Sequence, residues 1–281
     1  MVERADHVLS KNEELTKNRN LIVLSGGGKI ADIAREDATS LILYKLRHAD
    51  REYPLYHVQQ FFSIFLDLFF KLKITKSSYQ AELNEVVAYL KEEFDSNTLK
   101  RAEEIATRLR DSEIVFLATP KWYVPLLKQT TMFFNEIAMV PAHRNLLHEF
   151  THTEVAAFST PKNKLSIVTF RDSDDDMYSR DKVDILARML GDKAVAQNQS
   201  IEFVNIELNQ KNFFHSFFFA HFFTVYIAYF LGKYNDAEGR DLISITAGNP
   251  WWSQKSIEAF PSCTDIPGVL EPQEAQEEAL V

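Results

Sequence analysis

Cysteine is almost absent from this chain of 281 residues, which contains a single one, Cys263. One thiol cannot form an internal disulfide and cannot supply a cysteine-rich zinc site, so we expect a protein of the reducing cytoplasm. Basic residues are also in deficit, because 31 Lys and Arg stand against 40 Asp and Glu, which gives a formal net charge of −9. This balance argues against nucleic acid or an acidic membrane surface as the main partner, since both attract cationic patches.

Glycine is scarce as well, with 8 residues, three of which are consecutive at 26–28. The first 15 residues are polar and hold no apolar core, so we expect no secretory signal. In contrast, hydrophobic residues make up 46% of the chain, which excludes general disorder. The length suggests two domains. Apolar runs alternate with helical patterns, which predicts an α/β fold with parallel sheets.

The expected elements share this alternation in both halves of the chain. We predict strands at 21–24, 41–44, 114–118, 165–170 and 201–206, and helices at 29–36, 57–74, 80–94, 98–110, 122–139, 182–190 and 213–232. The helix at 57–74 is expected to be largely buried. The run at 213–232 has no formal charge and is long enough to span a membrane. We favour a buried core helix, because a lone span would have to hide His215, His221 and other polar groups in lipid.

Two short motifs can be interpreted either as binding sites or as ordinary structural features. Ser25-Gly26-Gly27-Gly28-Lys29 follows a strand and precedes a helix, where backbone N–H groups could bind a phosphate. It lacks the spacing of the known phosphate loops, so by itself it indicates a tight turn. The segment 148–152 matches H-E-x-x-H, which on a helix can bind zinc. The glycine and the third histidine of the longer zinc motif are replaced by Val155 and Phe158, so we rank a zinc peptidase third.

A carboxylate and an imidazole follow further along the chain in an order that suits sugar isomerisation. Asn135-Glu136 precedes Pro141-Ala142, and His152-Thr153-Glu154 comes 16 positions after Glu136. A Glu can remove a carbon-bound proton, and a His can move a hydroxyl proton. The later segment 170–174, Phe-Arg-Asp-Ser-Asp, ends a predicted strand.

With this series, residues 20–235 resemble the bifunctional phosphoglucose/phosphomannose isomerase family, whose members have N-E-N-A-K-x-P-A, H-N-E and L-R-D-x-x-D segments in this order. The resemblance implies two SIS-like (sugar isomerase) three-layer domains with parallel sheets flanked by helices, the first of them incomplete. We expect a partial first domain over 1–97, a second over 98–235 and an acidic extension over 236–281.

The resemblance also implies an activity and a set of site residues. The family interconverts glucose 6-phosphate or mannose 6-phosphate with fructose 6-phosphate, without a metal or an organic cofactor. Glu136 would be the base, and His152 would assist ring opening in a neighbouring subunit. Thr224 and Lys233 would lie near the sugar, and Arg51 and Ser25 are further candidates for substrate binding. We expect a homodimer, or a partner that completes the first domain.

Several departures from the family leave a second hypothesis open. The chain has no S-G-N-T phosphate loop, and no Arg follows Pro54, where the family has a Pro-Arg motif. Ile137, Met139 and Thr153 stand where the family has Asn, Lys and Asn, and the apolar side chains among them remove polar groups from the expected pocket. The alternative is therefore a catalytically silent homologue that binds a sugar phosphate or a protein partner.

Overall fold

The computed structural model describes residues 21–45, 57–158, 161–196 and 200–237. These residues form two compact units, one up to and including Phe65 and one from Leu66 on. Arg51, and the extension after residue 237 with Cys263, lie outside the described residues. The domain bounds at 97/98 and 235/236 remain a prediction.

The first unit contains a βαβ arrangement. Strand β1 (Ile22–Ser25) pairs in parallel with β2 (Ser40–Leu43), and helix α3 (Lys29–Glu36) connects them. The glycine turn predicted before α3 is present: Gly27 and Gly28 have φ values of 134° and 70°, which side chains other than glycine rarely adopt. Helix α4 (Val58–Lys71) begins in this unit, where the ring of Phe61 meets that of Tyr44 edge-on at 5.1 Å.

The prediction of a helix at 57–74 is confirmed, but the expectation that it is largely buried is wrong. None of the residues of α4 is buried, and Phe65, Phe69 and Phe70 are 45%, 38% and 42% exposed. An apolar run without Gly or Pro indicates a helix, but it does not tell how many sides of that helix are covered.

The second unit contains a parallel sheet of four strands in the order β4-β3-β5-β6. Its strands are β3 (Glu113–Ala118), β4 (Ala142–Leu146), β5 (Leu165–Arg171) and β6 (Ile201–Glu207). Its longer helices are α5 (Gln80–Glu93), α6 (Ser96–Leu109), α8 (Lys128–Phe133), α11 (Met177–Ala196) and α12 (Phe213–Tyr234). The short helical pieces are α7 (Pro120–Trp122), α9 (Leu147–Glu149) and α10 (Val155–Phe158). Three π-helical segments of five residues each, called π-turns below, are η2 (Tyr123–Leu127), η3 (Phe134–Ala138) and η4 (Phe150–Glu154).

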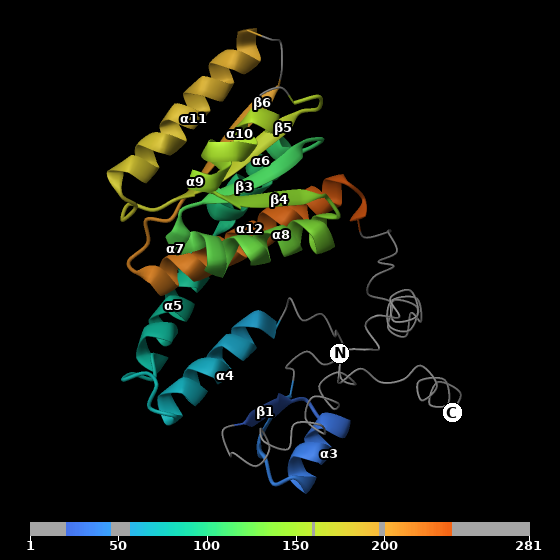
Figure 1. Ribbon diagram of the computed structural model, residues 1–281, viewed down its shortest axis with the longest axis vertical. Helices are drawn as coiled ribbons and strands as arrows, with labels where there is room; N and C mark the ends of the chain where they lie inside the picture. Colours follow the sequence, from blue (N-terminus) through green and yellow to red (C-terminus); the bar gives the residue numbers. More distant parts are fainter. Residues whose placement is uncertain (1–20, 46–56, 159–160, 197–199, 238–281) are drawn as a thin grey trace, which may run out of the picture. The chain divides into compact units, whose positions relative to one another are not determined.

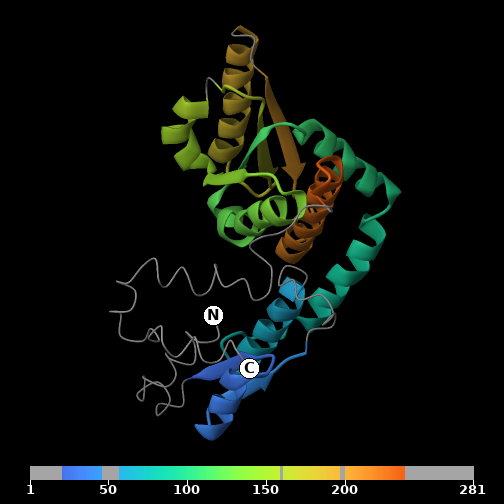
Figure 2. The same cartoon turned by 90° about the vertical axis from the view of Figure 1, so that its right-hand side faces the viewer.

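Helices cover both faces of this sheet, so the second unit has the three layers expected of an α/β fold. Figures 1 and 2 show α9, α10 and α11 on one face and α6 and α12 on the other. Alternate side chains of the strands face the two layers. On the α11 side, Val115 and Ile167 meet Leu186. On the α12 side, the ring of Phe116 meets that of Phe134 at 4.8 Å.

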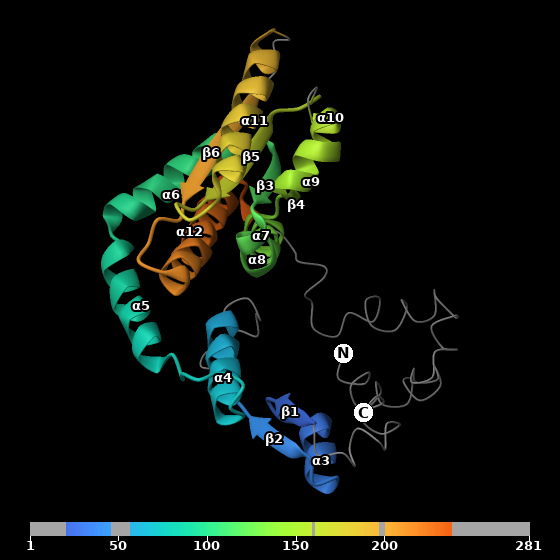
Figure 3. The ribbon, with the colours of Figure 1, turned by 60° about the vertical axis from the view of Figure 1, so that its left-hand side comes forward.

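Helix α12 is the apolar run noted in the sequence. It is long and apolar enough to cross a membrane, yet 67% of its most apolar stretch is buried inside the protein. It lies along α6 and against η3 (Figure 3). Ser216 donates a hydrogen bond to the carbonyl oxygen of Leu208 at 3.1 Å, and Phe223 is fully buried. These contacts support the interpretation of α12 as a core helix.

Candidate active site

The two proposed catalytic residues both lie in π-turns. Glu136 is in η3, which precedes β4, and His152 is in η4, which follows it. A π-turn inserts an extra residue into a helix, and such turns occur frequently at functional sites. Strand β4 lies at the edge of the sheet, next to β3. The topology therefore places the two turns at opposite ends of one edge strand, η3 before β4 and η4 after it.

Glu136 is half-buried, and no polar partner for its carboxylate is found in the part of the chain that the structure describes. Burial raises the pKa of the carboxyl group above its ordinary value, because the charged form loses hydration. A carboxylate with a raised pKa is a stronger base than an ordinary one. Such a group is suited to the removal of a carbon-bound proton.

The π-turn η3 is held on two sides. Asn135 accepts a hydrogen bond from the backbone N–H of Ala142 at 3.2 Å, which ties the turn to the first residue of β4. Helix α12 approaches the turn from the other side through Gly232, at a separation that leaves no space for a side chain. The turn ends at Met139, whose φ of 52° lies in the left-handed region and reverses the chain toward β4.

His152 has an exposed side chain on η4. The neighbouring hydroxyl of Thr151 is turned inward, toward the carbonyl oxygens of Leu147 and His148 at 3.0 Å each. An exposed imidazole in this position is free to contact another molecule. This arrangement is compatible with the role that the resemblance implies, in which the histidine works in a neighbouring subunit.

The structure does not assemble a zinc site around the H-E-x-x-H segment. His148 lies 3.3 Å from the hydroxyl of Ser179 and stacks on Tyr178 with the ring centroids 5.6 Å apart. Among the described residues, no group of three or more His, Cys, Asp and Glu side chains could hold a metal ion. A catalytic zinc needs three protein ligands, so His148 and His152 lack a third within that part of the chain.

The candidates on α12 are not brought together. The hydroxyl of Thr224 is buried and donates to the carbonyl oxygens of Ala220 and His221, at 2.8 and 3.0 Å, within its own helix. Lys233 is exposed, with its ammonium group 5.7 Å from the ring centre of Tyr229. Lys233 lies nine positions after Thr224, which places the two on opposite sides of a helix with 3.6 residues per turn.

Ser25 is also occupied locally. Its hydroxyl donates to the carbonyl oxygen of Gly27 at 2.9 Å and accepts from the N–H of the same residue at 3.1 Å. The hydroxyl thus closes the glycine turn. Arg51, the remaining candidate for substrate binding, lies outside the described residues.

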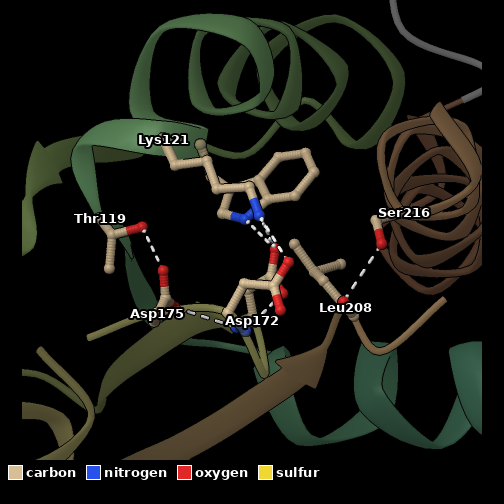
Figure 4. Close-up of polar contacts among 8 residues, drawn as sticks. Thr119, Lys121, Asp172, Asp175, Leu208 and Ser216 are labelled. Atoms are coloured by element: carbon tan, nitrogen blue, oxygen red, sulfur yellow. Dashed lines mark hydrogen bonds and ion pairs between the residues drawn. The ribbon is translucent and has the colours of Figure 1, made fainter. Parts of the chain in front are cut away.

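A polar cluster that the sequence did not reveal lies at the carboxyl ends of β3 and β5 (Figure 4). Asp172 accepts hydrogen bonds from the ammonium of Lys121 at 2.7 Å and from the indole N–H of Trp122 at 2.9 Å. Asp175 accepts from the hydroxyl of Thr119 at 2.9 Å and from the backbone N–H of Asp172 at 3.0 Å. The acidic run after β5 was visible in the sequence, but its distant partners were not.

The strand order makes this position significant. The chain leaves β3 toward β4 on one side and reaches β5 on the other, so β3 and β5 form the switch point at which ligands bind in open α/β sheets. Burial opposes the charge on Asp172, but the hydrogen bonds from Lys121, from the backbone N–H of Asp174 and from Trp122 outweigh it and hold the pKa of this carboxyl below its ordinary value. The ammonium of Lys121 and the indole N–H of Trp122 thus already donate to the carboxylate of Asp172 at the switch point.

Comparison with known proteins agrees with this architecture. The family described as the bacterial phospho-glucose isomerase C-terminal SIS domain matches residues 98–247, more than half of the chain. The chain belongs to this family. The SIS family match covers the four-stranded sheet, both π-turns with Glu136 and His152, and α12.

Solved structures show the same fold at low sequence identity. The "putative phosphosugar isomerase" from Clostridium difficile 630 is 14% identical with a TM-score of 0.53, over 85% of this chain and 82% of that one. The "putative sugar binding protein" from Salmonella typhimurium LT2 is 18% identical with a TM-score of 0.50, over 81% and 77%.

A third solved structure matches over a shorter stretch. The glucose-6-phosphate isomerase like protein from Thermus thermophilus is 15% identical with a TM-score of 0.36. The match covers 50% of this chain, which spans 44% of the length of that protein. A comparison with curated proteins gave no match.

Proposed function

We propose that this protein is an aldose–ketose isomerase of hexose 6-phosphates that interconverts glucose 6-phosphate or mannose 6-phosphate with fructose 6-phosphate. The observation that supports this most is the environment of Glu136. Its carboxylate lies half-buried in a π-turn and has a raised pKa. Membership of the phosphosugar isomerase SIS family supplies the substrate class.

The proposed reaction needs one carboxylate to move one proton between adjacent carbons. Glu136 removes the proton from C2 of the open-chain aldose. The electron pair of the broken C–H bond forms the C1=C2 double bond of the enediol, and the π pair of the C1 carbonyl moves onto its oxygen. The protonated Glu136 then returns its proton to C1, and a proton passes from the C2 hydroxyl to the oxygen on C1 by way of the solvent. Atoms and charge balance without any other reactant.

His152 is proposed to assist ring opening of the sugar held by a neighbouring subunit. The exposed side chain of His152 supports this role, because the imidazole is accessible to a second subunit. The protein is therefore proposed to act as a homodimer, or with a partner chain that completes the first unit. The scarcity of cysteine supports a cytoplasmic location.

A specific observation favours the second candidate, a silent homologue that binds a sugar phosphate or a protein partner. The hydroxyls of Ser25 and Thr224 are engaged by backbone groups, and Lys121 is paired with Asp172. A 6-phosphate needs several converging donors. In this hypothesis the SIS fold is retained for binding, and Glu136 has no proton to move.

Turnover by the purified chain separates the two candidates. We expect fructose 6-phosphate to be converted to glucose 6-phosphate or mannose 6-phosphate, and Glu136→Gln to abolish the conversion. Glu149→Gln is the matched control, because Glu149 is an exposed glutamate of the nearby H-E-x-x-H segment. Turnover that survives Glu136→Gln contradicts the assignment of the base. No turnover in the wild type favours the silent homologue. Turnover lost in Glu149→Gln as well would contradict a specific role of Glu136 as the base.

A further inference from the structure

The π-turn that carries Glu136 has an unusually close neighbour in α12. A methyl group added to Gly232 would lie 2.7 Å from the carbonyl oxygen of Ile137, and 3.4 Å from the Cα of Ala138. Side-chain Cβ atoms essentially never come closer than 3.0 Å to another heavy atom, so a side chain at position 232 requires the turn or the helix to shift. The atom in conflict belongs to the backbone, and it therefore cannot swing aside as a flexible side chain could.

Glycine is otherwise a costly choice at this position. In a helix interior it is less favourable than alanine by about 0.8–1.0 kcal/mol. Position 232 lies in the last turns of α12 and is buried. The benefit that offsets this cost is the close contact with Ile137, the residue that directly follows Glu136.

The opposite side of the same turn is held by Asn135, the residue that directly precedes Glu136. Its side-chain oxygen accepts the N–H of Ala142 at 3.2 Å. Because Asn135 is exposed, this bond crosses the outer surface of the turn, whereas Gly232 supports the inner surface. The two contacts involve the residues on either side of Glu136 and fix the backbone from which its side chain extends.

We propose that Gly232 and Asn135 are positioning residues that place the Glu136 carboxylate. Gly232 lets the π-turn pack closely on α12, and Asn135 bonds the turn to the first residue of β4. This inference rests on the proposed function for its effect on turnover, but not for its effect on the environment of Glu136. Neither residue touches the reacting atoms. A displaced base changes the rate of the chemical step more than substrate binding, and small displacements can lower the rate about 100-fold.

The chain offers a matched control for the glycine. Gly191 lies in α11, and a methyl group added there would meet nothing within 4 Å. The substitution Gly191→Ala makes the same chemical change in a helix without a collision, so it is expected to preserve the fold and the site. Any effect of Gly232→Ala beyond that of Gly191→Ala comes from the contact with η3.

The test measures the pKa of Glu136 by NMR of the full chain with ¹³C-labelled glutamate, assigned with Glu136→Gln. We expect Gly232→Ala to shift this pKa toward the ordinary value, because the displaced turn exposes the carboxyl group to water. Asn135→Ala is expected to shift it in the same direction and by less, and it keeps the proposal testable if Gly232→Ala does not fold. Gly191→Ala should leave the pKa unchanged.

In the turnover assay we expect kcat to fall about 10- to 100-fold in Gly232→Ala, with KM changed by less than about threefold. Folded Gly232→Ala and Asn135→Ala variants that both keep the wild-type pKa of Glu136 would overturn the proposal, and so would a Gly191→Ala variant that shifts this pKa as much as Gly232→Ala does. If the wild type shows no turnover, the proposed function fails, and the pKa measurement still decides whether the two residues hold the turn.

Discussion

Removal of the Asp172 carboxylate tests the polar cluster at the switch point of the sheet. In Asp172→Ala, the indole N–H of the fully buried Trp122 loses its acceptor. An unsatisfied buried donor costs about 1–3 kcal/mol. Lys121 is 36% exposed, so its ammonium group can turn to water, and loss of its ion pair adds only about 0–1 kcal/mol. We therefore expect the free energy of unfolding to fall by about 2–3 kcal/mol, in the middle of the combined range.

The effect should depend on pH in one direction. The pKa of Asp172 is lowered in the folded protein from its ordinary value of 3.8. Such a carboxyl stabilises the fold above its unfolded pKa, and the contribution is lost as the pH falls through the folded pKa. The difference between wild type and Asp172→Ala should thus be complete at pH 7 and shrink below about pH 4.

Urea unfolding followed by far-UV circular dichroism measures both effects. The matched control is Asp174→Ala, because Asp174 lies 3.6 Å from the same lysine but is 81% exposed. We expect this control to stay within about 0.5 kcal/mol of wild type. If Asp172→Ala is as stable as Asp174→Ala at pH 7, the cluster does not hold the ends of β3 and β5 together, and the reasoning is refuted.

Two further predictions concern the core and the proposed base. Glu136→Gln should raise the free energy of unfolding at neutral pH, because burial disfavours the charged carboxyl. This gain in stability should vanish as the pH falls from the raised folded pKa to the ordinary value of 4.5. Urea unfolding at pH 7 and pH 4 measures the gain, and an equal gain at both values would contradict the prediction. Phe223→Ala should cost about 3–5 kcal/mol, since Phe223 is fully buried, whereas Tyr229→Ala, at a residue that is 48% exposed, should cost less than about 1 kcal/mol. Equal losses of thermal stability in these two variants would contradict the core assigned to α12.

Apolar patterning predicted most of the second unit. The strands β3, β5 and β6 were expected within a residue at each end, because buried parallel strands are short apolar runs. Strand β4 was missed, since Ala142–Leu146 lies at the sheet edge and has largely polar side chains. The helix expected at 122–139 is present, but it is interrupted by π-turns that apolar spacing does not reveal.

The candidate site was only partly accessible from the sequence. The order of motifs identified Glu136 and His152 as candidates, but not the π-turns in which they lie. The pairing of Lys121 with Asp172 joins residues far apart in the chain, which no local pattern encodes. In contrast, the opposition of Thr224 and Lys233 on α12 follows from their spacing of nine residues and could have been predicted.

Deuterium exchange tests the central claim, that Glu136 moves a carbon-bound proton of a hexose 6-phosphate. Fructose 6-phosphate is incubated with the purified chain in D₂O and followed by proton NMR. We expect deuterium to enter C1 of fructose 6-phosphate, because the enediol is protonated by a carboxyl group that has exchanged with the solvent. We expect Glu136→Gln to abolish this incorporation. Incorporation by the wild type no greater than that by Glu136→Gln would contradict the claim.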